Sequence, residues 1–102
     1  MTWVRAGSVS SLAGGEAKVV EAGDRRIALC RVGDAVFAIE DVCSHDGGAL
    51  DQGTVDGFEI ECPRHGARFD VRNGKVLSLP AVRPIKSFAT RAVDGTIEVE
   101  VP

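Results

Sequence analysis

The sequence predicts a single domain built almost entirely of β-strands. Twelve glycines and four prolines separate many short segments that are rich in β-branched residues. No stretch shows the 3.6-residue apolar period of an amphipathic helix. A chain of 102 residues with 44% apolar content has the size and composition of one globular domain.

The first predicted hairpin joins the segments RRIALCRV and AVFAIED across a turn at Gly33-Asp34. In the first segment Ile27 and Leu29 alternate with smaller residues. Because successive side chains of a strand point to opposite faces, each strand is expected to bury one face. Cys30 lies on this segment and is predicted to be a small buried residue rather than a ligand.

The second hairpin is predicted near the end of the chain. Asp94-Gly95 is a strong tight-turn signal. After it, Ile97, Val99 and Val101 alternate with glutamates. The last strand should therefore have one buried and one wet face.

The region from Cys43 to Pro84 has a different texture. Its predicted strands, FEIEC, ARFDV and KVLSL, are very short. Six glycines interrupt it: Gly47, Gly48, Gly53, Gly57, Gly66 and Gly74. A loop-rich segment with little core of its own is expected where a bound cofactor organises the chain.

The charge distribution argues against nucleic acid as a partner, because the net charge is -3 and there is no basic stripe. Residues 34–61 hold eight acids and no base, whereas residues 64–91 hold seven bases and one acid. This asymmetry could steer a docking protein, and it could equally consist of solvated faces. No apolar leader or membrane-length segment is present, so a soluble cytoplasmic protein is expected. Three cysteines, an odd number, do not suggest a disulfide framework.

Four potential metal ligands form two short clusters, with Cys43 and His45 in one and Cys62 and His65 in the other, 16 residues apart. A structural zinc site of finger type would pair Cys with Cys and His with His. A catalytic Cys-His pair would not need the duplicate. A catalytic zinc would need a nearby acid or base, for which Asp46 is a weak candidate.

Loops that each mix one thiolate with one imidazole suit a two-iron cluster with two distinct irons. The string CSHDGG...CPRHGARFD resembles the Rieske family, whose small ferredoxins have a compatible length. The resemblance implies an antiparallel β-sandwich base, residues 1–42 and 82–102, carrying a cluster-binding subdomain of loops and short strands at about 43–81.

The resemblance also implies the roles of the ligands. Cys43 and Cys62 would bind one iron of a single [2Fe-2S] cluster, and His45 and His65 would bind the other through Nδ1. Three glycines fit positions where the backbone turns tightly and donates N-H groups to the sulfides: Gly47, Gly48 and Gly66. The segment Leu79-Pro80-Ala81 is similar to the third loop that shields the cluster in relatives, although a plain bend would look the same.

Two departures from the Rieske proteins of bc-type complexes bear on the redox chemistry. Gly48 and Arg64 stand where those proteins have a disulfide, so that bridge cannot form. Ala67 and Phe69 stand where a Ser and a Tyr would donate hydrogen bonds to sulfur. Fewer donors stabilise the reduced cluster less, which predicts a reduction potential near the low end of the Rieske range, roughly -150 mV.

The resemblance therefore implies an electron carrier rather than an enzyme. Its expected partners are a flavin-dependent NAD(P)H reductase and a terminal ring-hydroxylating oxygenase, both contacted transiently. The sequence contains neither a dinucleotide-binding fingerprint nor a second set of metal ligands, so nothing in it suggests that the protein catalyses a reaction. Two other interpretations stay open: a Rieske-like small subunit of a larger reductase, such as nitrite reductase, and a zinc-stabilised interaction module.

Overall fold

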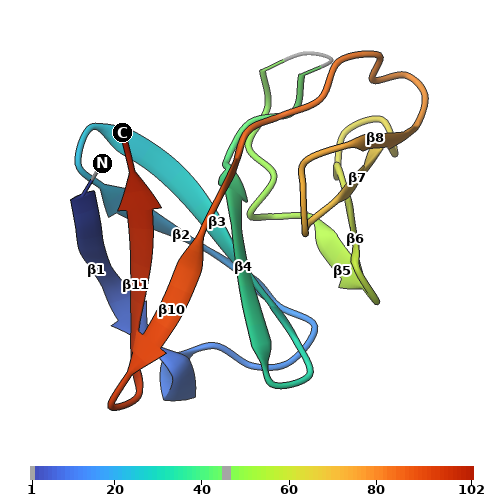
Figure 1. The fold of residues 1–102 in the computed structure, drawn as a ribbon. Helices are drawn as coiled ribbons and strands as arrows, with labels where there is room; N and C mark the ends of the chain where they lie inside the picture. Colours follow the sequence, from blue (N-terminus) through green and yellow to red (C-terminus); the bar gives the residue numbers. More distant parts are fainter. Residues whose placement is uncertain (1, 45–46) are drawn as a thin grey trace.

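A computed structural model describes residues 2–44 and 47–102. Within these residues the strands form three antiparallel sheets, as Figure 1 shows. The first sheet has the order β1 (Thr2–Ser8), β11 (Thr96–Val101), β10 (Thr90–Val93). The second has the order β2 (Ala17–Ala22), β3 (Arg25–Val32), β4 (Ala35–Glu40), β9 (Ser87–Phe88). The third has the order β5 (Thr54–Asp56), β6 (Glu59–Glu61), β7 (Arg68–Asp70), β8 (Val76–Ser78). A 3₁₀ turn at Val9–Ser11 follows β1. The all-β antiparallel fold predicted from the sequence is confirmed.

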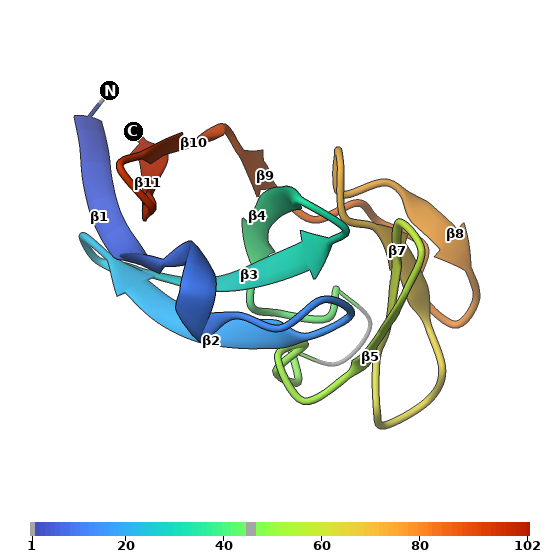
Figure 2. The same cartoon turned by 90° about the horizontal axis from the view of Figure 1, so that it is seen from below.

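The first two sheets pack face to face and form the base of the molecule (Figure 2). On β11, Ile97, Val99 and Val101 are buried between them, whereas the two intervening glutamates are half-exposed. This alternation is the one that the sequence predicted for the last strand. Burying one face of each sheet against the other removes apolar surface from water, which is the main stabilising term of such a sandwich.

Both predicted hairpins are present in the base. The turn between β3 and β4 has Gly33 at φ 61, and the turn between β10 and β11 has Asp94 at φ 51 and Gly95 at φ 79. A two-residue hairpin of type I′ needs positive φ at both central residues, which Asp94-Gly95 provides, whereas type II′ needs it only at the first, where Gly33 stands. The strands β1 and β2, by contrast, were not predicted.

The central strand β3 is buried on both faces, so the expectation of one buried face is wrong for it. Ile27 and Leu29 belong to the core of the base, while Ala28 and Cys30 belong to a second core on the other side of the sheet. All four side chains are at most 2% exposed. A strand covered on both faces carries a continuous apolar run, and here the third layer supplies the second cover.

That third layer is the sheet β5-β6-β7-β8 with its loops, which lies beside the base in Figures 1 and 2. Its four strands have three residues each. All of them fall within residues 43–81, the segment expected to form the cluster-binding subdomain. The division of the chain into these two structural units stays a prediction.

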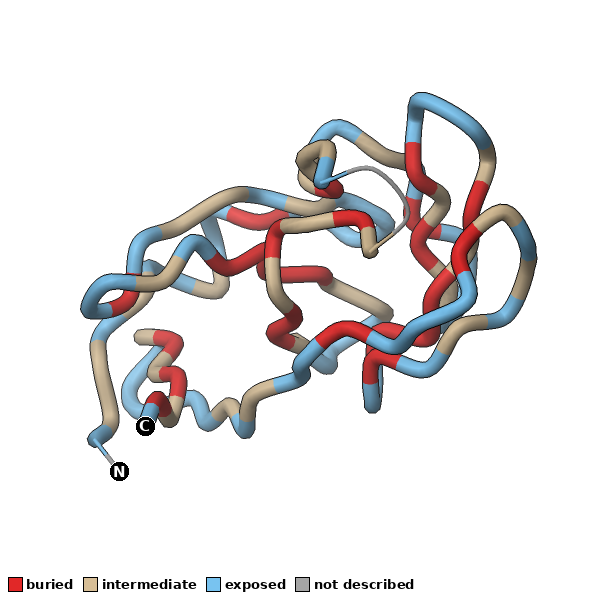
Figure 3. Tube along the Cα trace, turned by 90° about the horizontal axis from the view of Figure 1, so that it is seen from above, coloured by how far each residue is buried: buried red, intermediate tan, exposed pale blue. Residues whose placement is uncertain are grey.

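Figure 3 shows that buried segments occur both in the base and in the third layer. Among the described residues, no helix has the length and apolar character that crossing a membrane requires.

Candidate metal centre

The first ligand loop begins after β4. The N-H of Cys43 donates to the carbonyl oxygen of Gly48 at 2.7 Å, and the N-H of Gly47 donates to the carbonyl oxygen of Cys43 at 2.8 Å. Gly47 has φ 77, which only glycine adopts at little cost. The Cys43 side chain points inward, since the residue is 1% exposed.

The second ligand loop follows β6 and repeats this geometry. The N-H of Cys62 donates to the carbonyl oxygen of Ala67 at 2.7 Å, and the N-H of Gly66 donates to that of Cys62 at 3.1 Å. Gly66 has φ 76, and Cys62 is 1% exposed. In both loops the cysteine thus bonds to the residues four and five positions later. The local likeness of CSHDGG and CPRHG in the sequence corresponds to one shared backbone turn.

These bonds correct one expectation. The N-H groups of Gly47 and Gly66 were expected to donate to cluster sulfides, but each donates to the carbonyl oxygen of its own loop's cysteine. The two glycines therefore shape the loops through their positive φ.

The structure brings two of the four predicted ligands together. Cys43 and Cys62 lie in one apolar core, whereas His65 is exposed on the second loop. His45 and Asp46 lie outside the described residues. No group of three or more potential metal ligands is assembled among residues 2–44 and 47–102, which do not include His45.

The surroundings of the two cysteines fit a thiolate-bound metal. All three cysteines of the chain are within the described residues, and none forms a disulfide. Around Cys43 and Cys62, the core is closed by apolar side chains such as Leu50, Ile60 and Phe69. Iron compensates the charge of a thiolate that such a core would otherwise disfavour, so the donor set suits an iron–sulfur group.

Cys30 shares that core from the opposite side, on β3. Burial, and to a smaller extent the charge of Asp41, raises the pKa of the Cys30 thiol to about 12. Cys30 is therefore a protonated thiol at neutral pH and packs as a small apolar side chain, as the alternation of its strand predicted.

The third loop is anchored to the first. The hydroxyl of Ser44 donates to the carbonyl oxygen of Arg83 at 2.6 Å, across 39 positions of the chain. Ala81 is buried in the same core as the two cysteines, while Leu79 and Val82 are about three-quarters exposed, at 75% and 76%. The segment after the cis peptide Leu79-Pro80 therefore covers this core with one side and presents apolar side chains with the other.

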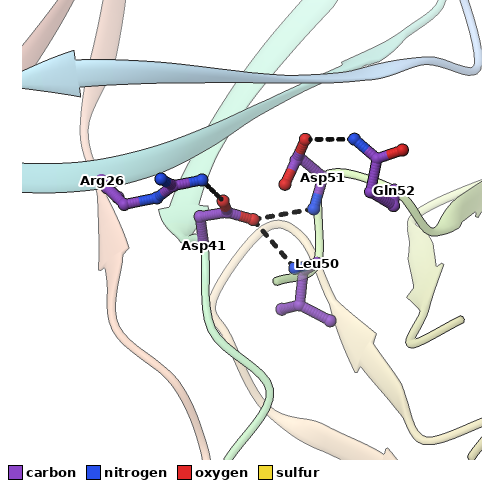
Figure 4. Close-up of polar contacts among 5 residues, drawn as sticks. All are labelled: Arg26, Asp41, Leu50, Asp51 and Gln52. Atoms are coloured by element: carbon purple, nitrogen blue, oxygen red, sulfur yellow. Dashed lines mark hydrogen bonds and ion pairs between the residues drawn. The ribbon is translucent and has the colours of Figure 1, made fainter. Parts of the chain in front are cut away.

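A buried carboxylate lies at the start of the first ligand loop. Asp41 accepts hydrogen bonds from the backbone N-H groups of Leu50 and Asp51, and it pairs with Arg26 at 3.2 Å (Figure 4). Burial raises the pKa of Asp41, an effect that the N-H donor and the guanidinium only partly oppose. Nothing in the sequence singles out Asp41, because its role depends on contacts with residues nine and ten positions later.

A second missed residue is Gly53. A Cβ built on it would stand 2.1 Å from the carbonyl oxygen of Glu61, the residue before Cys62. The chain leaving the first ligand loop thus passes directly against the chain entering the second. A glycine outside any predicted turn is the signal that could have revealed this contact.

The charge asymmetry along the sequence is partly neutralised in space. Arg68 lies 3.2 Å from Glu61 and 3.6 Å from Glu59 across the β6-β7 pair, and Arg72 lies 2.8 Å from Asp70. Two of the basic residues of segment 64–91 therefore pair with neighbouring carboxylates, so this segment does not form a purely basic surface.

Comparison with known protein families identifies the family of this chain. Residues 2–89 match the model of the Rieske [2Fe-2S] domain. The chain belongs to the Rieske [2Fe-2S] family. This Rieske protein therefore carries a [2Fe-2S] cluster, and the zinc alternative loses its basis.

Curated relatives match this Rieske protein over nearly its whole length. The anthranilate 1,2-dioxygenase ferredoxin subunit of Burkholderia cepacia is 35% identical over 97% of this chain and 92% of its own. The biphenyl 2,3-dioxygenase ferredoxin component of Rhodococcus jostii is 37% identical over 92% of this chain and 88% of its own.

Solved structures agree. The ferredoxin of carbazole 1,9a-dioxygenase from Nocardioides aromaticivorans has a TM-score of 0.93 and 35% identity, covering 97% of both chains. A chain from a complex of reduced oxygenase and oxidized ferredoxin in carbazole 1,9a-dioxygenase has a TM-score of 0.89 and 36% identity, covering 95% of this chain and 91% of that one. This Rieske protein is thus a ferredoxin, an electron-transfer component and not itself an enzyme.

Proposed function

We propose that Cys43 and Cys62 bind one iron of the [2Fe-2S] cluster and that His45 and His65 bind the other. The observation that carries this assignment is the pair of ligand loops with one shared backbone turn, each with a buried cysteine at its start. The two loops follow β4 and β6, and their cysteines belong to one apolar core.

When bound, the cluster supplies a reversible one-electron change. The chain's own residues exclude water from the thiolate side, because Leu50, Ile60 and Phe69 are fully buried around the cysteines. His65 on the second ligand loop is exposed, so its imidazole can meet a partner protein. A short and direct route between the iron and the surface is what a carrier needs.

The reduction potential is proposed to be low, roughly -150 mV. Ala67 and Phe69 are both 0% exposed and share the core with Cys62, and neither side chain carries a hydrogen-bond donor. A donor to sulfur stabilises the additional electron, so its absence favours the oxidised state.

The partners are proposed to be a flavin-dependent NAD(P)H reductase and a terminal oxygenase of a ring-hydroxylating system, both met transiently in the cytoplasm. The names of the relatives support the oxygenase system. The exposed Leu79 and Val82, with Arg83 beside them, offer apolar contact area on the loop that covers the core. A small surface of this kind suits brief contacts better than a permanent subunit interface.

A permanent place in a nitrite reductase has weaker support. The small subunit of a putative NADH-dependent nitrite reductase from Mycobacterium tuberculosis has a TM-score of 0.88 but only 24% identity, which shows the fold alone.

The assignment is tested on the anaerobically purified protein. It should contain iron and acid-labile sulfide in equal amounts, and after dithionite reduction it should give the electron paramagnetic resonance spectrum of a mixed histidine–cysteine [2Fe-2S] cluster. A spectrum typical of four cysteine ligands would contradict the ligand set. Electron delivery is then measured with a purified reductase and oxygenase of a ring-hydroxylating system, where oxygenase turnover should require the holoprotein.

A further inference from the structure

The carboxylate of Asp41 joins the two ends of the first ligand loop. Its Oδ1 accepts the N-H of Leu50 at 2.8 Å and the N-H of Asp51 at 2.7 Å (Figure 4). Asp41 stands two residues before Cys43, whereas Leu50 and Asp51 follow the loop. One side-chain atom thus fixes the distance between the entry and the exit of the segment that carries Cys43.

The second oxygen of the carboxylate has a separate partner. Oδ2 accepts a hydrogen bond from the guanidinium of Arg26 at 3.2 Å. The Asp41 side chain is 0% exposed, whereas that of Arg26 is 60% exposed. The backbone link is therefore buried, and the charge pair lies toward solvent.

The link continues into the core around the cysteines. Leu50, whose N-H is held by Asp41, is 0% exposed and lies in the same apolar core as Cys43. By holding the backbone of Leu50, Asp41 therefore also positions an apolar side chain of the core that contains Cys43.

We propose that Asp41 is a positioning residue for the iron–sulfur cluster, which it places by joining the two ends of the first ligand loop around Cys43. This inference rests on the ligand assignment of the proposed function. Residues that orient metal ligands without touching the metal commonly change metal affinity by about 10-fold to 100-fold when altered.

Asp70 provides a matched control. Like Asp41 it is 7% exposed and accepts hydrogen bonds from both backbone and guanidinium. Its partners all belong to Arg72, whose backbone N-H and Nε-H donate to Oδ1 at 2.9 Å and 3.0 Å and whose Nη2 donates to Oδ2 at 2.8 Å. Its turn at the end of β7 carries none of the proposed ligands. A general effect of losing a buried carboxylate should thus occur at both positions, whereas an effect on the cluster should occur only at Asp41.

The experiment compares the holoproteins Asp41→Ala, Asp41→Asn and Asp70→Ala with the unaltered protein. Cluster loss is followed by visible absorption in the presence of an iron chelator, and the reduced cluster by electron paramagnetic resonance. Asp41→Ala should shorten the cluster lifetime by about 10-fold and broaden the spectrum. Asp41→Asn should restore most of the lifetime, because its amide oxygen can still accept both N-H groups. Asp70→Ala should leave lifetime and spectrum unchanged.

Equal lifetimes in Asp41→Ala and Asp70→Ala would overturn the proposal, as would an Asp41→Asn cluster as short-lived as that of Asp41→Ala. Should Asp41→Ala fail to fold, hydrogen exchange of residues 47–53 in the unaltered holoprotein decides: slow exchange at Leu50 and Asp51 supports the link, and exchange as fast as in an open loop overturns it. A missing mixed-ligand spectrum in the unaltered protein would instead reject the proposed function.

Discussion

The two faces of β3 meet two different kinds of core. On one face Ile27 and Leu29 pack against β11, whose alternating Ile97 and Val99 fill the base. On the other face Ala28 and Cys30 share a core with the loops that carry Cys43 and Cys62 and with three-residue strands such as β6 and β7. One strand therefore supports a core made by regular alternation and a core made by individual contacts.

The difference shows which part of the molecule can hold itself together. The base owes its packing to strands of up to eight residues with tight hairpins. The cluster side has strands of three residues each, and it depends on glycine contacts, a buried carboxylate and, by our proposal, on iron. Perturbations on the cluster side should therefore change cluster binding far more than the base.

The largest expected effect comes from Cys62→Ser. Loss of a thiolate ligand should remove nearly all iron and acid-labile sulfide, because the hydroxyl is a poor replacement for a soft ligand. Hydrogen exchange should then rise in β6 and β7 and stay slow in β3 and β11. Cys30→Ala is the control, since Cys30 is equally buried in the same core and should leave the iron content unchanged. Iron retained by Cys62→Ser would refute the ligand assignment.

Gly53→Ala should have the next largest effect. The new methyl group would overlap the Glu61 carbonyl, so the two ligand loops must separate, at a cost of about 1–3 kcal/mol in the free energy of unfolding. Gly14→Ala is the matched control, because a Cβ there meets nothing within 4 Å and φ is not in the left-handed region. Thermal unfolding of the two holoproteins checks this prediction. Equal melting temperatures would show that the loops are not set by this contact.

Ala67→Ser tests whether the absence of hydrogen-bond donors to sulfur keeps the reduction potential low. A hydroxyl beside Cys62 can donate a hydrogen bond to sulfur and stabilise the reduced cluster, which should raise the midpoint potential. A net hydrogen-bond contribution of about 1 kcal/mol corresponds to roughly 40 mV for one electron. Voltammetry of the two holoproteins measures the difference. A lower potential in the variant would contradict the role given to missing donors.

The smallest effect is expected at Asp70 and concerns pH. Hydrogen bonds from the Arg72 guanidinium lower the pKa of Asp70 below its usual value of 3.8. The ionised form is thus favoured by folding, so the contribution to stability is present above pH 3.8 and is lost as the pH falls through the lowered pKa. Asp70→Asn should therefore lower the melting temperature at pH 7 and have a vanishing effect in strong acid. A difference that stays constant between these conditions would contradict this origin.

The base could be predicted from the sequence where local signals agreed. Asp94-Gly95 and the alternation after it specify a hairpin without help from other segments. The second face of β3 could not be predicted in this way, because Ala28 and Cys30 are covered by residues far along the chain. The roles of Asp41 and Gly53 could not be predicted for the same reason, since both residues act through contacts between segments that only the folded chain brings together. The family was predictable because two spaced ligand pairs are a rare pattern.

The unequal side chains of β3 have a consequence for protein engineering. The small residues Ala28 and Cys30 face the layer that carries the cluster ligands, while the larger Ile27 and Leu29 face the core of the base. A different metal-binding segment grafted in place of residues 43–81 would pack on this scaffold only if its contact surface were complementary to these two small residues. A larger side chain at position 28 or 30 would displace the cluster-binding layer and leave the packing of the two base sheets unchanged.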